Sequence, residues 1–393
     1  MTVAPPPAPA EPGGGMPLTV VIVDDSAVQR RFARAAIEAD SGLTVVGEAR
    51  NGRDAIALVD RLRPHAVLMD LHLPVMDGIE AIERIMATRP TPILVYSAFV
   101  DGDDRENAAA ALAAGAVDVM EKPQDASRLD EFAAALRRRI RVAGRVKVIT
   151  HPRGRLGGPA TTMVTRRPGQ PVRRPTGDPV AAVPAGPTHA LARRHVRLIA
   201  IGASTGGPQA LSQVLAELPA DLEAAVVVVQ HMADGFIEGL ASWLDGLCSL
   251  PVTVGANGRR LQPGTVTVAP SGLNLIVHDQ LRVTTHEPAK TQYHVPGIDA
   301  TFASVAESMG ADSVGVLLTG MGRDGALGLK LMRDAGAYTI AQDEETCAVY
   351  GMPAAAMALG AVELQLPLPE VGGALCQLST RRAAVEPAAE VAP

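Results

Sequence analysis

Apolar runs and helical repeats alternate along most of the chain. The first alternation starts at LTVVIVDD, continues with a helical pattern in SAVQRRFARAAIEA, and gives five strand–helix pairs before residue 141. Its strands are continuous apolar runs rather than alternations of apolar and polar residues, which indicates burial on both faces. Strands and helices in regular alternation form parallel sheets covered by helices. We therefore predict a doubly wound α/β domain over residues 18–141.

A second alternation begins at residue 197. VRLIAIGAS, EAAVVVVQHM, SVGVLLTGMG and YTIAQ are the predicted strands, and helical patterns separate them. Residues 250–287 contain short apolar runs broken by Gly, Pro and Asn, which is typical of antiparallel strands and turns. We predict a second doubly wound, mostly parallel α/β domain over residues 197–378, with a short antiparallel portion.

A segment rich in Pro, Gly and Arg separates the two blocks. Residues 142–196 show no periodicity, which predicts a disordered linker, and residues 1–17 and 379–393 are predicted to be disordered tails. From Arg145 to Arg197 the chain carries 11 basic residues and one acid, Asp178. A basic arm of this kind is either a solvated spacer or a contact for nucleic acid.

Composition narrows the possible function classes. Aromatic residues make up only 3% of the 393 residues, which argues against nucleic-acid binding by base stacking on aromatic rings. The three cysteines form no CxxC pair, which argues against a disulfide framework and a zinc site. The first residues lack the pattern of a signal peptide, and no apolar run approaches the ~18 residues that span a membrane. We expect a cytoplasmic protein without membrane insertion.

Polar residues follow the strands of the first block. Asp24 and Asp25 end the first strand, and Asp70 ends the third. Ser97 ends the fourth strand, and Lys122 ends the fifth. Because the carboxyl ends of parallel strands lie at one edge of a sheet, these side chains should meet. Three carboxylates favour a hard cation such as Mg²⁺, and lysine can hold a phosphate, so Asp70 is a candidate acceptor of a phosphoryl group.

The same stretches carry a family resemblance. VDDS, LMDLHLPVMDG, VYSA and EKP resemble the receiver domain of two-component response regulators over residues 18–137. The resemblance implies a flavodoxin-like fold, phosphorylation of Asp70 by a histidine kinase, Mg²⁺ held by the three carboxylates, and supporting roles for Ser97 and Lys122. Many receivers carry an aromatic switch residue in the last strand, where this chain has Val119.

In the second block, Ser204 lies in IGASTGGPQAL, between a predicted strand and a predicted helix. Three interpretations compete: a tight turn with a capping serine, a phosphate-binding loop, and a nucleophile on a strand-to-helix turn. The phosphate-binding loop is weakly supported, because the stretch lacks both the G-x-G-x-x-G spacing and a Gly-Lys-Ser/Thr ending.

Two later strand ends favour the nucleophile. His231 ends one predicted strand, and Asp324 lies in the loop after another. Since all three residues should reach the same sheet edge, His231 could accept the proton of Ser204 while Asp324 orients the imidazole. Gly206 and Gly207 would let substrate approach the helix N-terminus, whose free N–H groups could hold an oxyanion.

Other candidate residues are weaker. His278, His286 and His294 are spaced by eight residues in a turn-rich stretch, without acids or cysteines at ligand spacing. We expect surface residues there rather than a metal site. Cys347 has no histidine near it in sequence, so we expect a small buried residue rather than a thiol nucleophile.

The second block also resembles a known family. IGASTGGP, VVVQHM, LLTGMGRDGA and IAQDEETCAVYGMP are similar to the catalytic domain of chemotaxis protein-glutamate methylesterases, the CheB family, over residues 197–365. The resemblance implies a Rossmann-like serine hydrolase that demethylates γ-glutamyl methyl esters on chemoreceptors, releasing methanol, and deamidates glutamines. It implies that Ser204, His231 and Asp324 are catalytic, that Met321 supplies an oxyanion N–H, and that Thr205 and Gly206 flank the nucleophile.

Two positions depart from the family pattern. HVPGIDATF has Gly297 where the family usually has serine, and Ala233 follows QHM where proline is common. Neither position belongs to the predicted triad, so the departures concern the substrate loops and the choice of receptor.

We therefore predict a phosphorylation-regulated hydrolase that resets chemosensory adaptation. It would use Mg²⁺ for receiver phosphorylation and no cofactor for ester hydrolysis, with a histidine kinase and methylated chemoreceptors as partners and without nucleic acid. Phosphorylation of Asp70 would release a restraint of the receiver on the hydrolase. Two other classes stay open: a DNA regulator acting through the basic linker, although no helix-turn-helix pattern is present, and a catalytically silent scaffold.

Overall fold

The computed structural model describes residues 16–98, 102–123, 129–146, 196–232, 235–289, 292 and 294–379. Most of the predicted linker and of the two predicted tails lies outside the described residues, so their disorder stays a prediction. Among the residues that are described, no helix is both long enough and apolar enough to cross a membrane. The two blocks contain separate sheets, and each block is described by itself.

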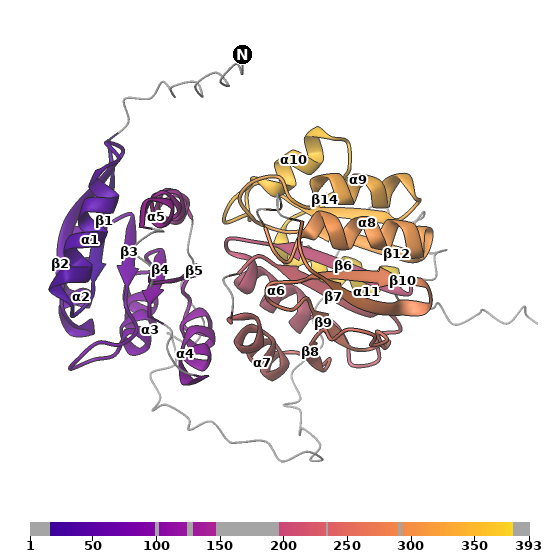
Figure 1. Cartoon of the computed structure of the whole chain (residues 1–393), viewed down its shortest axis with the longest axis horizontal. Helices are drawn as coiled ribbons and strands as arrows, with labels where there is room; N and C mark the ends of the chain where they lie inside the picture. Colours follow the sequence, from indigo (N-terminus) through magenta and orange to yellow (C-terminus); the bar gives the residue numbers. More distant parts are fainter. Residues whose placement is uncertain are drawn as a thin grey trace, which may run out of the picture. The chain divides into compact units, whose positions relative to one another are not determined.

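The first block alternates strands and helices, as predicted (Figure 1). Polar side chains cap several of its helices: Ser26, Asn51 and Asp77 each accept an N–H from the first turn of the helix that follows. The elements in chain order are β1 (Leu18–Val23), α1 (Ala27–Glu38), β2 (Leu43–Ala49), α2 (Gly52–Leu62), β3 (Ala66–Met69), α3 (Gly78–Thr88), β4 (Ile93–Ser97), α4 (Gly102–Ala113), β5 (Asp118–Glu121) and α5 (Leu129–Ala143).

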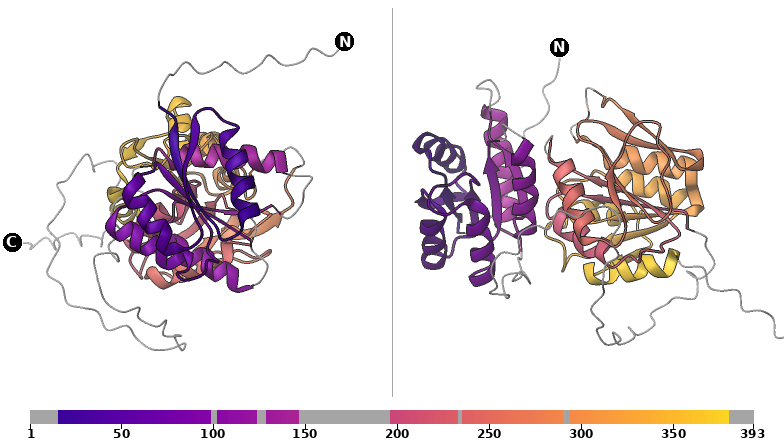
Figure 2. Two further views of the ribbon diagram at one scale, coloured as in Figure 1. Left: turned by 90° about the vertical axis from the view of Figure 1, so that its left-hand side faces the viewer. Right: turned by 90° about the horizontal axis from the view of Figure 1, so that it is seen from below.

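The five strands form one parallel sheet in the order β2-β1-β3-β4-β5. Helices cover both faces (Figure 2), with α1 contacting α5 on one side and α2 contacting α3 on the other. The residues of β3 and β4 are all buried, which explains why the sequence shows continuous apolar runs there. Ile22, Leu68 and Leu94 pack with Ile37 of α1 and Leu136 of α5 in one core. The predicted doubly wound architecture of the first block is confirmed.

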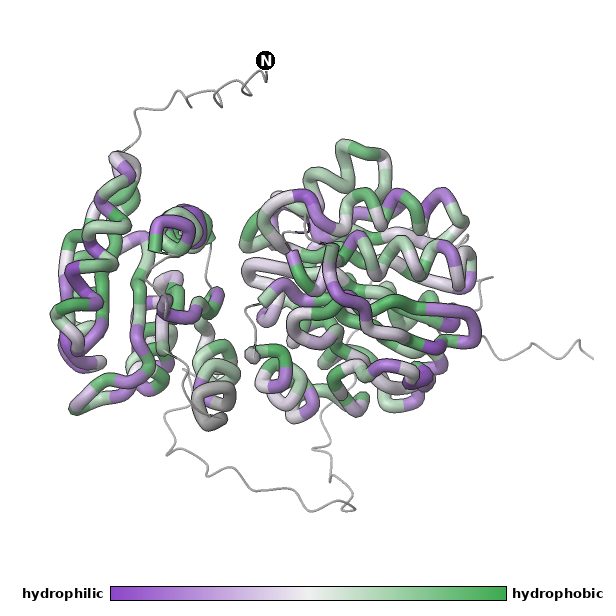
Figure 3. The backbone as a smooth tube through the Cα atoms, in the orientation of Figure 1, coloured by the Kyte–Doolittle hydropathy of each residue, from purple (hydrophilic) through white to green (hydrophobic). Residues whose placement is uncertain are grey.

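The second block is larger. Figure 3 shows that apolar residues follow its strands, in agreement with the complete burial of β6 and β7. Its elements are β6 (Leu198–Ala203), α6 (Gly207–Ala216), β7 (Ala225–Gln230), α7 (Ile237–Leu247), β8 (Val252–Val254), β9 (Val266–Val268), β10 (Asn274–His278), β11 (Arg282–His286), α8 (Ile298–Met309), β12 (Ser313–Leu317), α9 (Ala326–Asp334), β13 (Tyr338–Gln342), α10 (Met352–Ala358), β14 (Leu364–Leu366) and α11 (Leu368–Ser379).

Seven of these strands form a parallel sheet in the order β14-β13-β12-β6-β7-β9-β8. The prediction for residues 250–287 was partly wrong, because β8 and β9 join this sheet as parallel strands. Only β10 and β11 form the expected antiparallel pair. Residues 255–265 separate β8 from β9 and leave enough chain for a parallel return, which local turn residues do not reveal.

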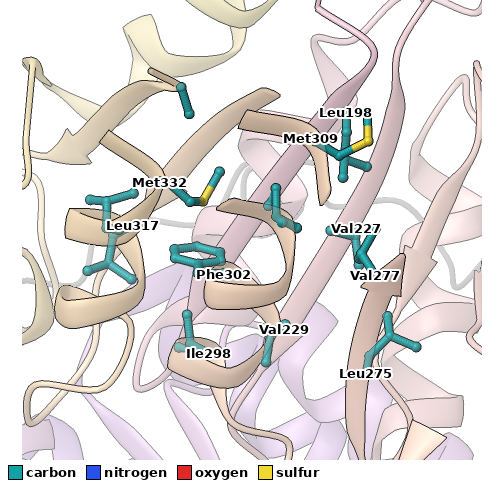
Figure 4. Close-up of a cluster of buried hydrophobic side chains, with 14 of the residues drawn as sticks. Leu198, Val227, Val229, Leu275, Val277, Ile298, Phe302, Met309, Leu317 and Met332 are labelled. Atoms are coloured by element: carbon teal, nitrogen blue, oxygen red, sulfur yellow. The ribbon is translucent and has the colours of Figure 1, made fainter. Parts of the chain in front are cut away.

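One face of the large sheet is covered by α8 and α9. The side chain of Phe302 on α8 is fully buried beside Leu317 of β12 and Met332 of α9 (Figure 4). The two helices approach closely because Gly328 has no side chain: a Cβ there would lie 2.6 Å from Cβ of Phe302. This packing fixes the start of α8, which contributes directly to the site described below.

Two elements at the end of the chain were missed by the sequence analysis. Strand β14 has three half-buried residues, too few for a recognisable pattern. Helix α11 packs against α6 and buries Val371, Leu375 and Leu378. Its apolar spacing was present in the sequence, and two consecutive glycines within it weakened the helical signal.

Candidate functional site

Ser204 is the first residue after β6, at the turn into α6. Its N–H donates to the carbonyl oxygen of Thr319 (3.0 Å), and its own carbonyl accepts the N–H of Gly207 (2.7 Å). Gly206 has a φ of 75°, a conformation that favours glycine, and a Cβ there would lie 2.5 Å from Cβ of Ala348. The hydroxyl therefore sits on a tight turn at the N-terminal end of a helix.

His231 is held beside this turn by the register of the sheet. Strands β6 and β7 are parallel neighbours, and their last paired residues are Ala203 and Gln230. The next N–H, that of His231, donates to the carbonyl of Ala203 (3.0 Å). Ser204 and His231 thus both leave the sheet at the same point of two adjacent strands, as the sequence predicted.

Asp324 reaches the same edge from the loop after β12, the strand on the other side of β6. Its Oδ2 lies 2.8 Å from Nε2 of His231 and also accepts the N–H of Ile298 (2.9 Å). Its Oδ1 accepts the N–H groups of Asp299 and Gly325, each at 3.0 Å. The carboxylate is therefore bound at the N-terminal end of α8, where backbone N–H groups favour negative charge.

These contacts determine the charge of Asp324. Burial acts to raise its pKa, but the hydrogen bond and charge of His231, together with the N–H groups of Ile298 and Asp299, outweigh burial and lower the pKa to about 2. An ionised carboxylate can only accept hydrogen bonds, so Nε2 of His231 carries the proton of the neutral imidazole. Nδ1 is then the basic nitrogen; it is buried and has no hydrogen-bond partner among the described residues.

The loop between β12 and α9 closes the site from the other side. Gly320 packs against Ser204 so closely that a Cβ at Gly320 would lie 2.7 Å from Cβ of Ser204. Met321 follows in the same loop, and the hydroxyl of Thr319 donates to the carbonyl of Thr205 (3.0 Å). The structure thus places Thr205 and Gly206 in the turn after Ser204 and Met321 in the loop whose Gly320 packs on Ser204, while their roles stay predictions.

His294 departs from our expectation of a surface residue. Its ring stacks on that of His231, with centroids 4.5 Å apart and planes 7° from parallel. His278 and His286 are exposed, as expected, and their Nε2 atoms both contact the hydroxyl of Thr284. The sequence carried one indication of this position. His294 lies in the same HVPGIDATF stretch as Asp299, whose N–H binds Asp324.

Cys347 is half-buried, whereas we expected a small buried residue. Burial, followed by the charge of Asp343, raises the pKa of this thiol to about 12. A thiol that stays protonated at neutral pH is a poor nucleophile. Gly297 forms the N-cap of α8 and donates its N–H to Asn274, whereas Ala233 lies outside the described residues.

A second polar cluster lies at the strand ends of the first block. The hydroxyl of Ser97 donates to Oδ1 of Asp70 (2.6 Å), and Nζ of Lys122 donates to Oδ2 of the same carboxylate (2.5 Å). Nζ of Lys122 also forms an ion pair with Oδ2 of Asp24 at 2.7 Å. Asp24, Asp70 and Lys122 are buried, whereas Asp25 is exposed at the rim. All five predicted residues thus meet in one pocket.

The charges of this pocket do not cancel. Oxygen atoms of Asp24, Asp25 and Asp70 lie within 4.8 Å of one another, and Lys122 is the cation that contacts two of them. Burial raises the pKa of Asp24, although the hydrogen bond and charge of Lys122 oppose that rise. Three oxygen donors with excess negative charge suit a hard divalent cation, so these residues fit Mg²⁺.

An aromatic residue was missed in this pocket. The β5 position discussed above holds Val119, which is fully buried. Tyr96 of β4 is also buried; its hydroxyl donates to Gln29 on α1 (3.1 Å), and Nζ of Lys122 lies 5.1 Å from its ring centroid. Burial, followed by the charges of the two buried aspartates, raises the pKa of Tyr96. Its position just before Ser97 was the only sequence signal.

Comparison with known proteins agrees with this architecture. Residues 199–375 match the CheB methylesterase family, and residues 20–134 match the response regulator receiver domain. Protein-glutamate methylesterase/protein-glutamine glutaminase 2 of Anaeromyxobacter dehalogenans is 40% identical over 368 residues, which cover 93% of this chain and 98% of that protein. A protein of the same name, numbered 1, from Cupriavidus pinatubonensis is 41% identical over 362 residues, or 92% and 97% of the two chains.

Among solved structures, the CheB methylesterase catalytic domain of Thermotoga maritima is 35% identical, with a TM-score of 0.44, and the match covers 47% of this chain and 98% of that one. The full-length relatives span both blocks. The chain belongs to the protein-glutamate methylesterase/protein-glutamine glutaminase family, in which a response regulator receiver domain precedes a CheB methylesterase domain.

Proposed function

We propose that the second block demethylates γ-glutamyl methyl esters and deamidates glutamines on chemoreceptors, with Ser204 as nucleophile, His231 as base and Asp324 as the orienting acid. The observation that carries this proposal is the 2.8 Å contact between His231 and Asp324, formed beside the turn that bears Ser204. The names of the relatives supply the substrate class. The protein would act in the cytoplasm, the location expected from its sequence.

The acylation step follows from the tautomer. Nδ1 of His231 accepts the proton of the Ser204 hydroxyl while the serine oxygen attacks the carbonyl carbon of the ester. The resulting imidazolium stays paired with the ionised Asp324. The imidazolium then protonates the departing methoxy oxygen, so that methanol leaves and an acyl-serine remains. For a glutamine substrate the leaving group is ammonia.

Deacylation reverses these roles. Nδ1 accepts a proton from water, the hydroxide oxygen attacks the acyl carbon, and the bond to Ser204 breaks as its oxygen regains the proton. The product is a glutamate side chain. The oxyanion of each tetrahedral intermediate needs N–H donors, and that of Gly207 is already bound to the carbonyl of Ser204. We assign the oxyanion to the N–H groups around Thr205, Gly206 and Met321.

The first block would regulate this reaction. A phosphohistidine of a kinase transfers its phosphoryl group to an Oδ atom of Asp70, with the phosphorus–nitrogen bond breaking as the phosphorus–oxygen bond forms. Lys122 and Ser97, which contact Asp70, would hold the transferred group. Asp24, Asp25 and Asp70 would hold a Mg²⁺ ion, which would neutralise the charge of the incoming phosphate. Phosphorylation would then release the restraint on the hydrolase.

Methanol release from methylated chemoreceptor membranes tests the catalytic proposal. Ser204→Ala should abolish release while the chain stays folded, because the nucleophile is lost. Undiminished release by this variant contradicts the serine mechanism. No release by the wild-type chain, with or without a phosphodonor, would favour the catalytically silent scaffold.

A separate assay tests the regulation. Acetyl phosphate with Mg²⁺ should raise the methanol rate of the wild-type chain, and Asp70→Asn should reduce the ratio of stimulated to basal rate to about one. A stimulated rate in Asp70→Asn equal to that of the wild type contradicts the assignment of Asp70. Omitting Mg²⁺ provides the matched control.

A further inference from the structure

Gln230, the last residue of β7, connects the two halves of the proposed reaction centre. Its side chain is only 1% exposed. One nitrogen, Nε2, donates to the carbonyl oxygen of Ser204 (2.9 Å) and to the carbonyl oxygen of His231 (2.8 Å). A single buried amide thus binds the peptide that follows the nucleophile and the peptide that follows the base.

The position of this amide matters because the strand pairing stops there. The register of β6 and β7 ends at Ala203 and Gln230, and the N–H of His231 makes the last bond between the two strands. Beyond it, Ser204 turns into α6 and His231 enters a loop. Gln230 adds two side-chain bonds beyond the end of the strand pairing, one to each of these two residues.

Gly207 provides the space for this amide. A Cβ at Gly207 would lie 2.0 Å from Oε1 of Gln230, and Oε1 itself is buried without a hydrogen-bond partner among the described residues. The φ of Gly207 is not positive, so the glycine is required for space rather than for backbone conformation. Gly207, which was predicted from the sequence to let substrate approach, lies against Gln230.

We propose that Gln230 is a positioning residue that sets the distance between Ser204 and His231, and that Gly207 is its steric complement. The inference rests on the proposed roles of Ser204 and His231. It goes beyond them by assigning a function to a side chain that touches neither the substrate nor the imidazole ring. Small displacements of reacting groups cost up to about 10²-fold in rate, so the effect should fall on kcat.

The first experiment compares Gln230→Met with a matched control, Ser313→Ala, in the full chain. Ser313 is 1% exposed and donates to the carbonyl of Gly310 (2.7 Å) at the opposite end of the same sheet. Both variants lose buried side-chain bonds to backbone, but only Gln230→Met loses those near Ser204. Methanol release, labelling of Ser204 by a fluorophosphonate, and thermal unfolding are measured for each.

We expect Gln230→Met to lower kcat and the labelling rate by about 10- to 100-fold with KM changed by less than about twofold. Ser313→Ala should retain both rates. Equal rates in the two variants, at equal loss of stability, would overturn the inference. If instead Ser204→Ala keeps its activity and labelling, the proposed catalytic function fails, and the two failures are thereby distinguished.

The second experiment uses the contact with Gly207 and stays informative even if Gln230→Met is poorly folded. Gly207→Ala should lower kcat because its methyl group displaces the amide. Adding Gln230→Ala to Gly207→Ala should lower kcat much less than Gln230→Ala lowers it in the wild type, because the displaced amide has already lost its bonds. Independent effects that multiply in the double variant would contradict the pairing of these residues.

Discussion

In the five-stranded sheet the chain order reverses between β1 and β3, and in the seven-stranded sheet it reverses between β6 and β12. Polar residues gather at both reversals, where neighbouring loops diverge and leave room for a ligand. The pocket of the first block holds its carboxylates against Lys122, with charge left over. The second block binds the carboxylate of Asp324 through one imidazole and three backbone N–H groups, and the carboxyl of Asp299 lies beside it.

This difference fits the proposed roles of the two sites, which are to receive a charged group in the first block and to move a proton in the second. Asp24 is buried with its pKa raised by that burial, so the folded first block is destabilised by the ionised form. Asp324 has a lowered pKa, so the folded second block is stabilised by the ionised form. Removing one carboxylate charge should therefore have opposite consequences for stability in the two blocks.

The largest expected effect concerns Asp324→Asn. The amide would donate to Nε2 or leave it unpaired, which disturbs the tautomer that makes Nδ1 basic. In serine-protease triads this change lowers kcat about 10⁴-fold, and we expect the rate of methanol release to fall about 10³- to 10⁴-fold. Unfolding followed by the fluorescence of Trp243 should also show a loss of about 1–3 kcal/mol, since bonds to a charged acceptor are lost. An active, equally stable Asp324→Asn contradicts the assignment.

Asp24→Asn should sharpen the contrast. The variant removes a buried charge, so the first block becomes more stable, which slower hydrogen exchange in β1 and β3 would reveal. Its affinity for Mg²⁺ should fall by more than about tenfold, because one oxygen donor loses its charge. Faster exchange together with unchanged Mg²⁺ affinity is the opposite outcome, and it would remove the claim that this pocket carries excess negative charge.

Acid should act on the second block through Asp324. Its folded pKa of about 2 lies below the ordinary value of 3.8, so its contribution is fully present above about pH 5 and is lost as the pH falls to about 2. The ionised carboxylate contributes about 2 kcal/mol to the free energy of unfolding of the second block. Denaturant unfolding of wild type and Asp324→Asn at pH 5 and pH 2.5 measures it, because the difference between the two proteins should shrink at the lower pH. A difference in unfolding free energy that is the same at both pH values contradicts a lowered pKa of Asp324.

The smallest expected effect concerns the stacked ring of His294. Stacked aromatic pairs contribute about 0.5–1.5 kcal/mol, so His294→Ala should lower kcat about two- to tenfold by loosening the plane of His231. His294→Phe keeps a stacking ring and should stay close to the wild-type rate. A Phe variant as slow as the Ala variant would show that the second imidazole acts through its nitrogen atoms instead of its plane.

Much of the fold and of both sites could be predicted from the sequence, because burial and strand direction leave a local signal. Continuous apolar runs identified β1, β3, β6, β7 and β12, and parallel strands bring their ends to one edge. Ser204, His231 and Asp324 follow such runs, and so do the residues around Asp70. Their meeting was therefore predictable although up to 120 residues separate them in the sequence.

The remaining features depend on contacts that have no local pattern. The parallel pairing of β8 and β9 depends on how residues 255–265 return, and three-residue strands carry little periodicity. The contacts of Gln230 and His294 join residues from different elements, and neither glutamine nor histidine signals burial by its residue type. The position of Tyr96 beneath Lys122 depends on side-chain packing between β4 and β5.

The central position of the proposed reaction centre does not isolate it from the outer strands. Strands β12, β6 and β7 are consecutive neighbours in the middle of the sheet, whereas β9 and β13 lie outside them. The loop that follows the outer strand β13 nevertheless packs against the turn that bears Ser204, since a Cβ at Gly206 would lie 2.5 Å from Cβ of Ala348, so changes in that loop should reach the reaction centre. Chimaeras that exchange the loop after β13 should therefore change the rate of methanol release, although that loop carries none of the three proposed catalytic residues.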